Sequence, residues 1–201
     1  MPQLNGAVVD VGCGSKPYRD LVNASRYVGL DYDSSLRRQE GFADVYYDGG
    51  AFPFTNEEFD GALCSQVLAH VFNPAEFLGE IARIWKPGGH LVLTVPFVWD
   101  EHEQPFDCAR YSTFGLQAML QRAGFETIEH RKTLPDIRVF FQLFNAYLFK
   151  VTLTSNQRVN QLMALVLMAP VNVGAVVVNW VTSRNPDLYL AHVVVALKLH
   201  Q

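Results

Sequence analysis

The sequence predicts an α/β fold with a mostly parallel sheet and helices on both faces of that sheet. Short apolar runs, which suit strands buried on both faces, alternate with stretches whose apolar residues recur every three or four positions. Because parallel strands need a crossover connection, this alternation favours helices between the strands. The 201 residues, 49% of them hydrophobic and 18% charged, are expected to form a single folded domain, residues 1–201.

Each strand is predicted from a short apolar run with turn residues beside it. The predicted strands are Ala7–Val11, Tyr27–Leu30, Ala43–Tyr47, Gly61–Cys64, His90–Val95, Phe125–Thr133 and Tyr189–Leu199. One helix is expected to begin at Asn73-Pro74, since Asn caps helices and Pro fits the first turn. Its expected end is Lys86-Pro87-Gly88-Gly89, where proline and glycine cannot continue the helix. A second helix is expected over Thr113–Arg122.

Residues 136–184 are hydrophobic and mainly helical in pattern, and they are expected to form an insertion or lid before the last strand. Within them, Leu162–Val181 is almost wholly apolar and about long enough to cross a bilayer. We favour a buried helical hairpin or a homodimer contact, with peripheral membrane contact as the alternative. A spanning helix is disfavoured because Asn172 and Asn179 would be costly in lipid.

Composition excludes several classes of function. The formal net charge is −4 and the Lys and Arg residues are scattered, so no nucleic-acid partner is expected. Cys13, Cys64 and Cys108 are odd in number and far apart, which predicts neither a disulfide framework nor a metal site. No basic stretch followed by an apolar one opens the chain, so we expect a cytoplasmic protein, with membrane association through 136–184 as the alternative.

The turn Asp10-Val11-Gly12-Cys13-Gly14 follows the first predicted strand, and ligands of parallel sheets bind beyond the carboxyl ends of strands. Its glycines have no side chain, so a ligand could approach the backbone closely. Asp10 could accept hydrogen bonds from a ligand amine or from the N–H groups of the turn. A tight structural loop is the alternative. Pro17 stands where a dinucleotide fingerprint has its third glycine, which disfavours NAD.

Polar residues also follow the next three predicted strands. Asp31 lies 21 residues beyond Asp10, a spacing that suits an acid on the two hydroxyls of a ribose. Asp48 follows the third strand and could accept the amino group of adenine. Ser65 and Gln66 would face the ligand from the end of the fourth strand.

Taken together, these motifs resemble the class I S-adenosylmethionine-dependent methyltransferases, in particular the type 11 methyltransferase domain. The resemblance covers about residues 7 to 133 and rests on Asp10–Gly14, Tyr27–Asp31, Ala51–Phe54 with Phe59-Asp60, and Trp85–Gly89. It implies a Rossmann-like, seven-stranded sheet with an antiparallel last strand. Two departures are Lys16, where many relatives carry a third glycine, and Ala69, where many carry a glutamate.

The resemblance also implies the cofactor and its contacts. Asp10, Gly12 and Gly14 would line the methionine half of S-adenosylmethionine, Asp31 would hold the ribose, and Asp48 would lie beside adenine. Ser65 and Gln66 would sit near the sulfonium. The full predicted set is Asp10, Gly12, Cys13, Gly14, Asp31, Tyr32, Asp48, Gly49, Ser65 and Gln66.

The loop Pro96–Tyr111 is the predicted location of a general base for methyl transfer. His102 is the candidate because an imidazole side chain suits removal of a proton from a hydroxyl, and Glu101 or Glu103 could orient its ring. The alternative is that His102 ties down the loop through hydrogen bonds. For Asp107 and Arg110 we favour a structural ion pair.

The segment from His102 to Tyr111 resembles a subset of type 11 proteins found among cell-envelope glycan and lipid enzymes. With the apolar region 136–184, it predicts a small-molecule or amphipathic acceptor, such as a lipid-linked sugar or a quinone-like ring. Two other functions stay open: a cofactor-binding partner or regulatory protein without turnover, and a nicotinamide-dependent oxidoreductase. The missing third glycine disfavours the last of these.

Overall fold

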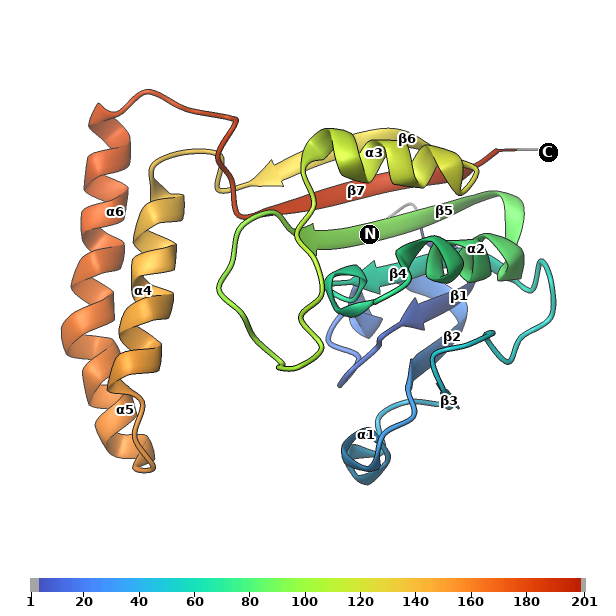
Figure 1. Ribbon diagram of the computed structural model, residues 1–201, viewed down its shortest axis with the longest axis horizontal. Helices are drawn as coiled ribbons and strands as arrows, with labels where there is room; N and C mark the ends of the chain where they lie inside the picture. The colour runs from blue at the N-terminus through green and yellow to red at the C-terminus, as the bar shows by residue number, and fades with distance from the viewer. Residues whose placement is uncertain (1–3, 200–201) are drawn as a thin grey trace. The chain divides into compact units, whose positions relative to one another are not determined.

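The computed structural model describes residues 4–199 and contains a seven-stranded sheet in the order β3-β2-β1-β4-β5-β7-β6 (Figure 1). Strands β1 to β5 pair with one another in parallel, and β7, which lies next to β5, runs in the opposite direction. The predicted sheet, mostly parallel with an antiparallel last strand, is therefore confirmed. The strands are β1 Asn5–Val11, β2 Asn23–Tyr32, β3 Val45–Tyr47, β4 Phe59–Ser65, β5 Trp85–Pro96, β6 Phe125–Thr133 and β7 Ala191–Lys198.

The chain forms two compact units. The first, which we call the sheet unit, comprises the chain up to Pro96, Glu103–Arg131 and the chain from His192. The second, the helical unit, comprises Phe97–His102 and Lys132–Ala191. The predicted insertion, residues 136–184, falls wholly within the helical unit.

The core of the sheet unit lies on the face covered by α2 (Pro74–Ile84) and α3 (Thr113–Arg122) (Figure 1). Because side chains alternate along a strand, Val9 of β1 joins this cluster while Val8 points to the other face. There, the smaller cluster packs against Tyr18 and Val22, beside the 3-10 turn η1 (Arg19–Leu21). A short helix that the sequence did not predict, α1 (Ser35–Glu40), lies between β2 and β3.

Helix α2 begins at Pro74 as predicted but ends earlier than predicted. The structure ends it at Ile84, and the run Lys86–Gly89 lies inside β5, so the predicted helix stop is wrong. The physical reason is tertiary: Trp85 is fully buried, lies against Phe125 and pairs with Phe59 in the sheet. That burial favours extended backbone at Trp85 over one more helical residue.

The helical unit is a hairpin of two long helices. Helix α4 (Arg138–Thr152) packs beside α6 (Ala169–Val181), and α5 (Gln157–Met163), the π-helical η3 (Ala164–Met168) and α6 form one continuous helix (Figure 1). The sequence predicted the hairpin and also predicted that it would be buried. The structure does not show that burial, because only 6% of an apolar 18-residue stretch within Gln157–Val181 is buried. One neighbouring helix covers one face only. By length and composition this helix could cross a membrane.

Candidate functional site

The glycine turn after β1 is held in place by its own backbone. The N–H groups of Gly12 and Cys13 donate to the carbonyl of Leu30 in β2, at 2.8 and 3.1 Å. Gly12 has φ +72°, and a Cβ there would lie 2.1 Å from Cγ2 of Val67. Gly14 has φ +47°, and a Cβ there would meet no atom within 4 Å. Packing therefore demands glycine at 12, whereas the backbone of Gly14 faces open space.

A cavity of about 280 Å³ opens beside this turn. It is lined by Asp10, Gly12, Cys13, Gly14, Ser15, Pro17, Tyr18, Ser65 and Gln66. Six of the ten predicted cofactor-binding residues thus share one cavity, because β1 and β4 are parallel neighbours whose carboxyl ends meet at one edge of the sheet.

Asp10 is the buried acid of this cavity. One of its carboxylate oxygens accepts a hydrogen bond from the Tyr27 hydroxyl at 2.5 Å. Burial raises the pKa of Asp10 to about 6; the Tyr27 hydrogen bond opposes this rise and the nearby Asp31 carboxylate adds to it. Burial likewise raises the pKa of the Cys13 thiol to about 12. The cavity therefore holds a carboxylate that becomes fully charged only near neutral pH, beside a protonated thiol.

The other four predicted residues lie at the ends of β2 and β3. One oxygen of Asp31 accepts from the N–H of Gly14 at 3.1 Å, and the other accepts from the N–H of Tyr32. Tyr32 is half exposed, and a Cβ on Gly49 would lie 3.3 Å from its ring. Exposed Asp48 accepts from the N–H of Gly50. These residues do not line the cavity, but Asp31 joins them to it through Gly14.

Sequence reasoning missed three residues of the site. The Tyr18 hydroxyl lies 3.3 Å from Oγ of Ser65, and Tyr18 lines the cavity. Thr94 of β5 lies 3.0 Å from Oγ of Ser65 and accepts from the Gln66 side chain at the same distance. Tyr27 was noted only as the start of a strand. The alternation of β2 is the signal that could have placed its side chain beside that of Asp10, one strand away.

Lys16, which replaces the third glycine of many relatives, keeps the backbone that a glycine would allow. Its φ is +56°, in the left-handed region. Its ammonium group lies 2.6 Å from the Asp44 carboxylate, which also accepts from the N–H of Gly29 at 2.7 Å. This ion pair links the turn to the residue before β3, and it helps to offset the backbone strain of the positive φ at Lys16.

His102, the predicted general base, belongs to the helical unit. Its Nδ1 lies 3.2 Å from the carbonyl oxygen of Asp100. In the sheet unit, the Arg110 guanidinium donates two hydrogen bonds, of 2.5 and 2.7 Å, to the Asp107 carboxylate, which confirms the predicted structural ion pair. His70 lies 3.2 Å from the carbonyl oxygen of Phe106, as expected of a structural histidine.

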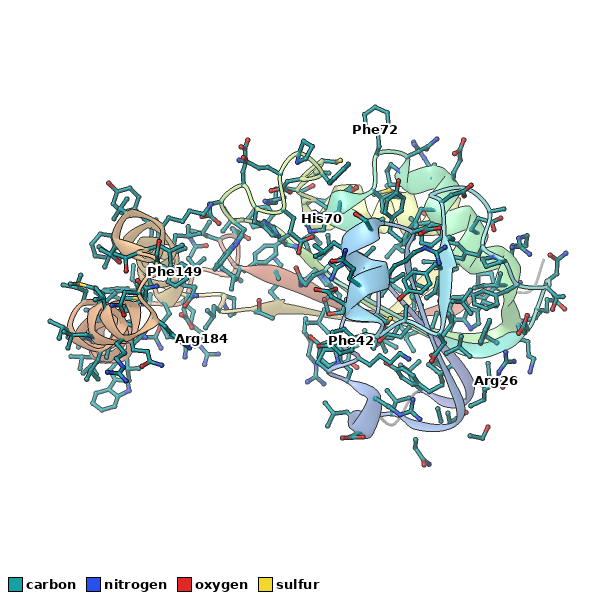
Figure 2. All side chains as sticks on the ribbon, turned by 90° about the horizontal axis from the view of Figure 1, so that it is seen from below. Arg26, Phe42, His70, Phe72, Phe149 and Arg184 are labelled. Carbon is teal, nitrogen blue, oxygen red and sulfur yellow. The ribbon has the colours of Figure 1, made fainter. Side chains whose placement is uncertain are left out.

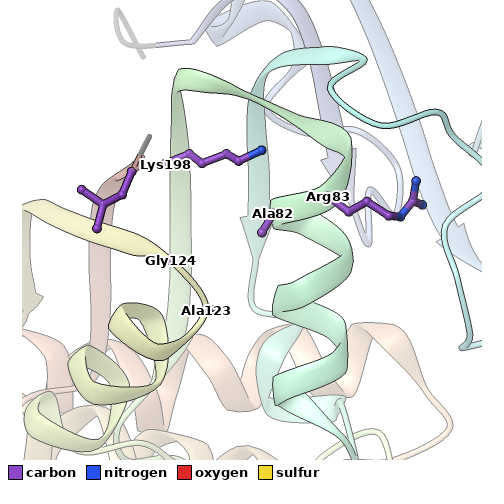
Figure 3. A pocket seen from close by; sticks show the side chains of 6 residues that line it. Ala82, Arg83, Ala123, Gly124 and Lys198 are labelled. Atoms are coloured by element: carbon purple, nitrogen blue, oxygen red, sulfur yellow. The ribbon is translucent and has the colours of Figure 1, made fainter. Parts of the chain in front are cut away.

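A second hollow, of about 200 Å³, lies at the ends of α2 and α3 (Figure 3). The two basic residues that line it make structural contacts. Lys198 donates a hydrogen bond of 2.6 Å to the carbonyl of Trp85, and Arg83 forms an ion pair of 2.7 Å with Glu80. We therefore assign the candidate site to the first cavity.

Comparisons with known proteins show what the chain is similar to. Residues 9–93 match the family model described as a methyltransferase domain. A probable S-adenosylmethionine-dependent methyltransferase of Mycolicibacterium smegmatis is 29% identical over 59% of this chain and 51% of its own length. An O-methyltransferase of Penicillium expansum is 30% identical over 71% of this chain and 60% of its own length. The chain thus spans about half of the first relative.

A solved structure of similar fold is an S-adenosylmethionine-dependent methyltransferase from Mesorhizobium loti. Its TM-score is 0.61 at 15% identity, and the match covers 98% of this chain and 94% of the other. The matched region, residues 9–93, contains the glycine turn, Asp31, Asp48 and Ser65–Gln66. Residues 9–93 therefore match a methyltransferase domain, and the chain is similar to S-adenosylmethionine-dependent methyltransferases in sequence and in fold.

Proposed function

We propose that the protein transfers the methyl group of S-adenosylmethionine to a hydroxyl of a small-molecule or amphipathic acceptor, such as a lipid-linked sugar or a quinone-like ring. The observation that carries this proposal is the cavity beside the glycine turn, whose lining includes buried Asp10, Ser65 and Gln66. A relative that is named an O-methyltransferase supports an oxygen nucleophile.

The residues of the cavity fit the methionine end of the cofactor. Gly14 has open space where a Cβ would stand, so a ligand can lie against its backbone. Asp10 offers a carboxylate to an ammonium group, and Ser65 and Gln66 offer polar groups at the end of β4. When bound, the cofactor supplies an electrophilic methyl group; the protein aligns it and excludes water.

His102 is the residue that we propose as general base. A carbonyl oxygen can only accept, so the Nδ1–H group of His102 donates a hydrogen bond to the backbone carbonyl of Asp100, and we assign the role of base to Nε2. That nitrogen can take the proton that a hydroxyl loses as its oxygen bonds to the methyl carbon. The thioether product leaves as S-adenosylhomocysteine.

Calorimetry tests the cofactor assignment. We expect the protein to bind S-adenosylhomocysteine and to show no comparable affinity for NAD. Binding of NAD without S-adenosylhomocysteine would favour the oxidoreductase. Binding of S-adenosylhomocysteine without methyl transfer to any acceptor class tried would favour the regulatory protein.

Asp31→Ala is expected to weaken S-adenosylhomocysteine binding by roughly one to two orders of magnitude, because a charged acceptor is lost. The loss also releases the N–H of Gly14. Asp31→Asn keeps an acceptor for that N–H, so calorimetry on both variants separates the charge from the support of the turn. The matched control is Asp33→Ala, which removes a nearby acid paired with Arg38. Equal affinities for wild type and Asp31→Ala would place the ribose elsewhere.

His102→Gln is expected to lower kcat by roughly 10²- to 10⁴-fold, because the proton acceptor is lost. Transfer of labelled methyl groups to a hydroquinone or lipid-linked sugar analogue measures this rate, and calorimetry should show unchanged cofactor affinity. Loss of the acid limb of the pH–rate profile would distinguish a base from a loop anchor. His90→Gln, in β5, is the control. An unaltered kcat and profile in His102→Gln would rule out the proposed role.

A further inference from the structure

The hairpin segment of the helical unit, residues 137–186, is basic although the chain is acidic, whereas the whole unit contains five basic and four acidic residues. Between Asp136 and Asp187 the sequence contains no acidic residue, and its four charged residues are Arg138, Lys150, Arg158 and Arg184. The whole chain has a formal net charge of −4. Arg138 is ion-paired with Asp136 and Lys150 with Asp100, so Arg158 and Arg184 are the residues that we expect to complement an anionic surface.

The long helix Gln157–Val181 exposes a stripe of apolar side chains. Most of them stand three or four positions from another member, as on one face of a helix: Leu162, Leu165, Val166, Val173, Val176, Val177, Trp180 and Val181. Trp180 and Val181, at the end of the helix, are 80% and 83% exposed. Helix α4 exposes a similar stripe, formed by Phe140, Phe144, Tyr147 and Val151. Patches of this kind mark interaction surfaces.

The contact between the two helices includes a buried polar pair. Asn145 of α4 is buried and donates a 2.7 Å hydrogen bond to Asn172 of α6. Near it, Gly174 lies beside Phe141, and a Cβ at position 174 would make an ordinary contact of 3.9 Å with that ring. A hydrogen bond between amide side chains of the two helices, together with many exposed apolar side chains, is typical of helix pairs in lipid.

We propose that the helical unit binds an anionic lipid bilayer, with its exposed apolar stripes in one leaflet and its basic residues among the headgroups. Trp180 suits the boundary between headgroups and acyl chains. Figure 2 shows Phe149 and Arg184 on this unit. This surface lies outside the cofactor cavity, so membrane binding can be tested independently of methyl transfer.

The hairpin lies in one leaflet and does not cross the bilayer. Helix α4 has 15 residues, about 22 Å, which is shorter than the hydrocarbon core of about 30 Å. Near the tip of the hairpin, Lys150 lies 2.7 Å from the Asp100 carboxylate and donates to the carbonyl of Glu101. Crossing would carry this polar cluster through the hydrocarbon, at a high cost.

Flotation of the full chain with vesicles tests the proposal. We expect the protein to float with vesicles of phosphatidylcholine and phosphatidylglycerol, and to bind less to phosphatidylcholine alone or at high salt. The fluorescence of Trp180, isolated by comparison with Trp180→Phe, should shift to the blue on binding.

The double variant Val173→Glu with Trp180→Glu is expected to lower vesicle binding by roughly one to two orders of magnitude, since two apolar anchors are lost. Phe72→Glu is the matched control: Phe72 is 94% exposed on the sheet unit (Figure 2). Calorimetry with S-adenosylhomocysteine and thermal unfolding verify that each variant is folded.

Two results would overturn the proposal. One is a wild-type protein that does not float and shows no shift of Trp180 fluorescence. The other is vesicle binding that the double variant retains. If the wild type fails to float and sedimentation equilibrium shows a dimer that the double variant loses, the occupant of this surface is a second copy of the chain.

Discussion

Gly12→Ala should destabilise the folded protein by about 2 to 5 kcal/mol. An L residue at φ +72° costs about 1 to 2 kcal/mol. The added Cβ would also lie 2.1 Å from Cγ2 of Val67, and overpacking of this kind costs about 1 to 3 kcal/mol. Denaturant unfolding followed by circular dichroism measures the loss.

Gly14→Ala is the matched comparison at the other glycine of the turn. Its φ of +47° brings a conformational cost of about 1 kcal/mol, but a Cβ there meets no protein atom within 4 Å. We expect this variant to fold well and to bind S-adenosylhomocysteine much more weakly, because the methyl group occupies space proposed for the ligand. Val67→Ala should restore part of the stability of Gly12→Ala. Equal stabilities of the two alanine variants would contradict the packing role of Gly12.

Asp10→Asn is expected to stabilise the protein at pH 8 by about 2 to 3 kcal/mol and to have little effect near pH 4. The pKa of Asp10 is raised from 3.8 to about 6 in the folded state, so the folded state binds more protons than the unfolded state between these values. The free energy of unfolding of the wild type therefore falls as pH rises through this window. The asparagine side chain has no charge to desolvate and can still accept from the Tyr27 hydroxyl.

Unfolding titrations at several pH values between 4 and 8 measure this effect, and the slope should flatten in Asp10→Asn. Tyr27→Phe is the companion variant. It removes the hydrogen bond that lowers the pKa of Asp10, so the steep part of the curve should extend to higher pH. Identical pH dependence in wild type and Asp10→Asn would show that Asp10 does not titrate in this range. The cost of burying this acid is explained if its charge serves to bind the cofactor.

Local patterns in the sequence determined the strands of the sheet and the polar residues at their carboxyl ends. Alternating apolar runs placed all seven strands, and α3 and β6 have the predicted bounds because their ends carry clear stop signals. The glycine turn, Asp31, Asp48 and Ser65 each follow a strand, so a parallel sheet brings them to one edge without further information. The resemblance to methyltransferases also followed from these motifs.

Only the tertiary structure decided which residues meet. That Gly12 is required by Val67 while Gly14 faces open space depends on a contact across 55 positions of the chain, and no local pattern encodes it. The pairing of Tyr27 with Asp10 and the early end of α2 at buried Trp85 have the same cause, since burial by distant segments sets their energies. The apolar segment Leu162–Val181 was recognised from sequence, but its exposure depends on how few neighbours it packs against. The composition of a helix sets how much apolar surface it has, whereas packing against other segments determines how much of that surface is buried.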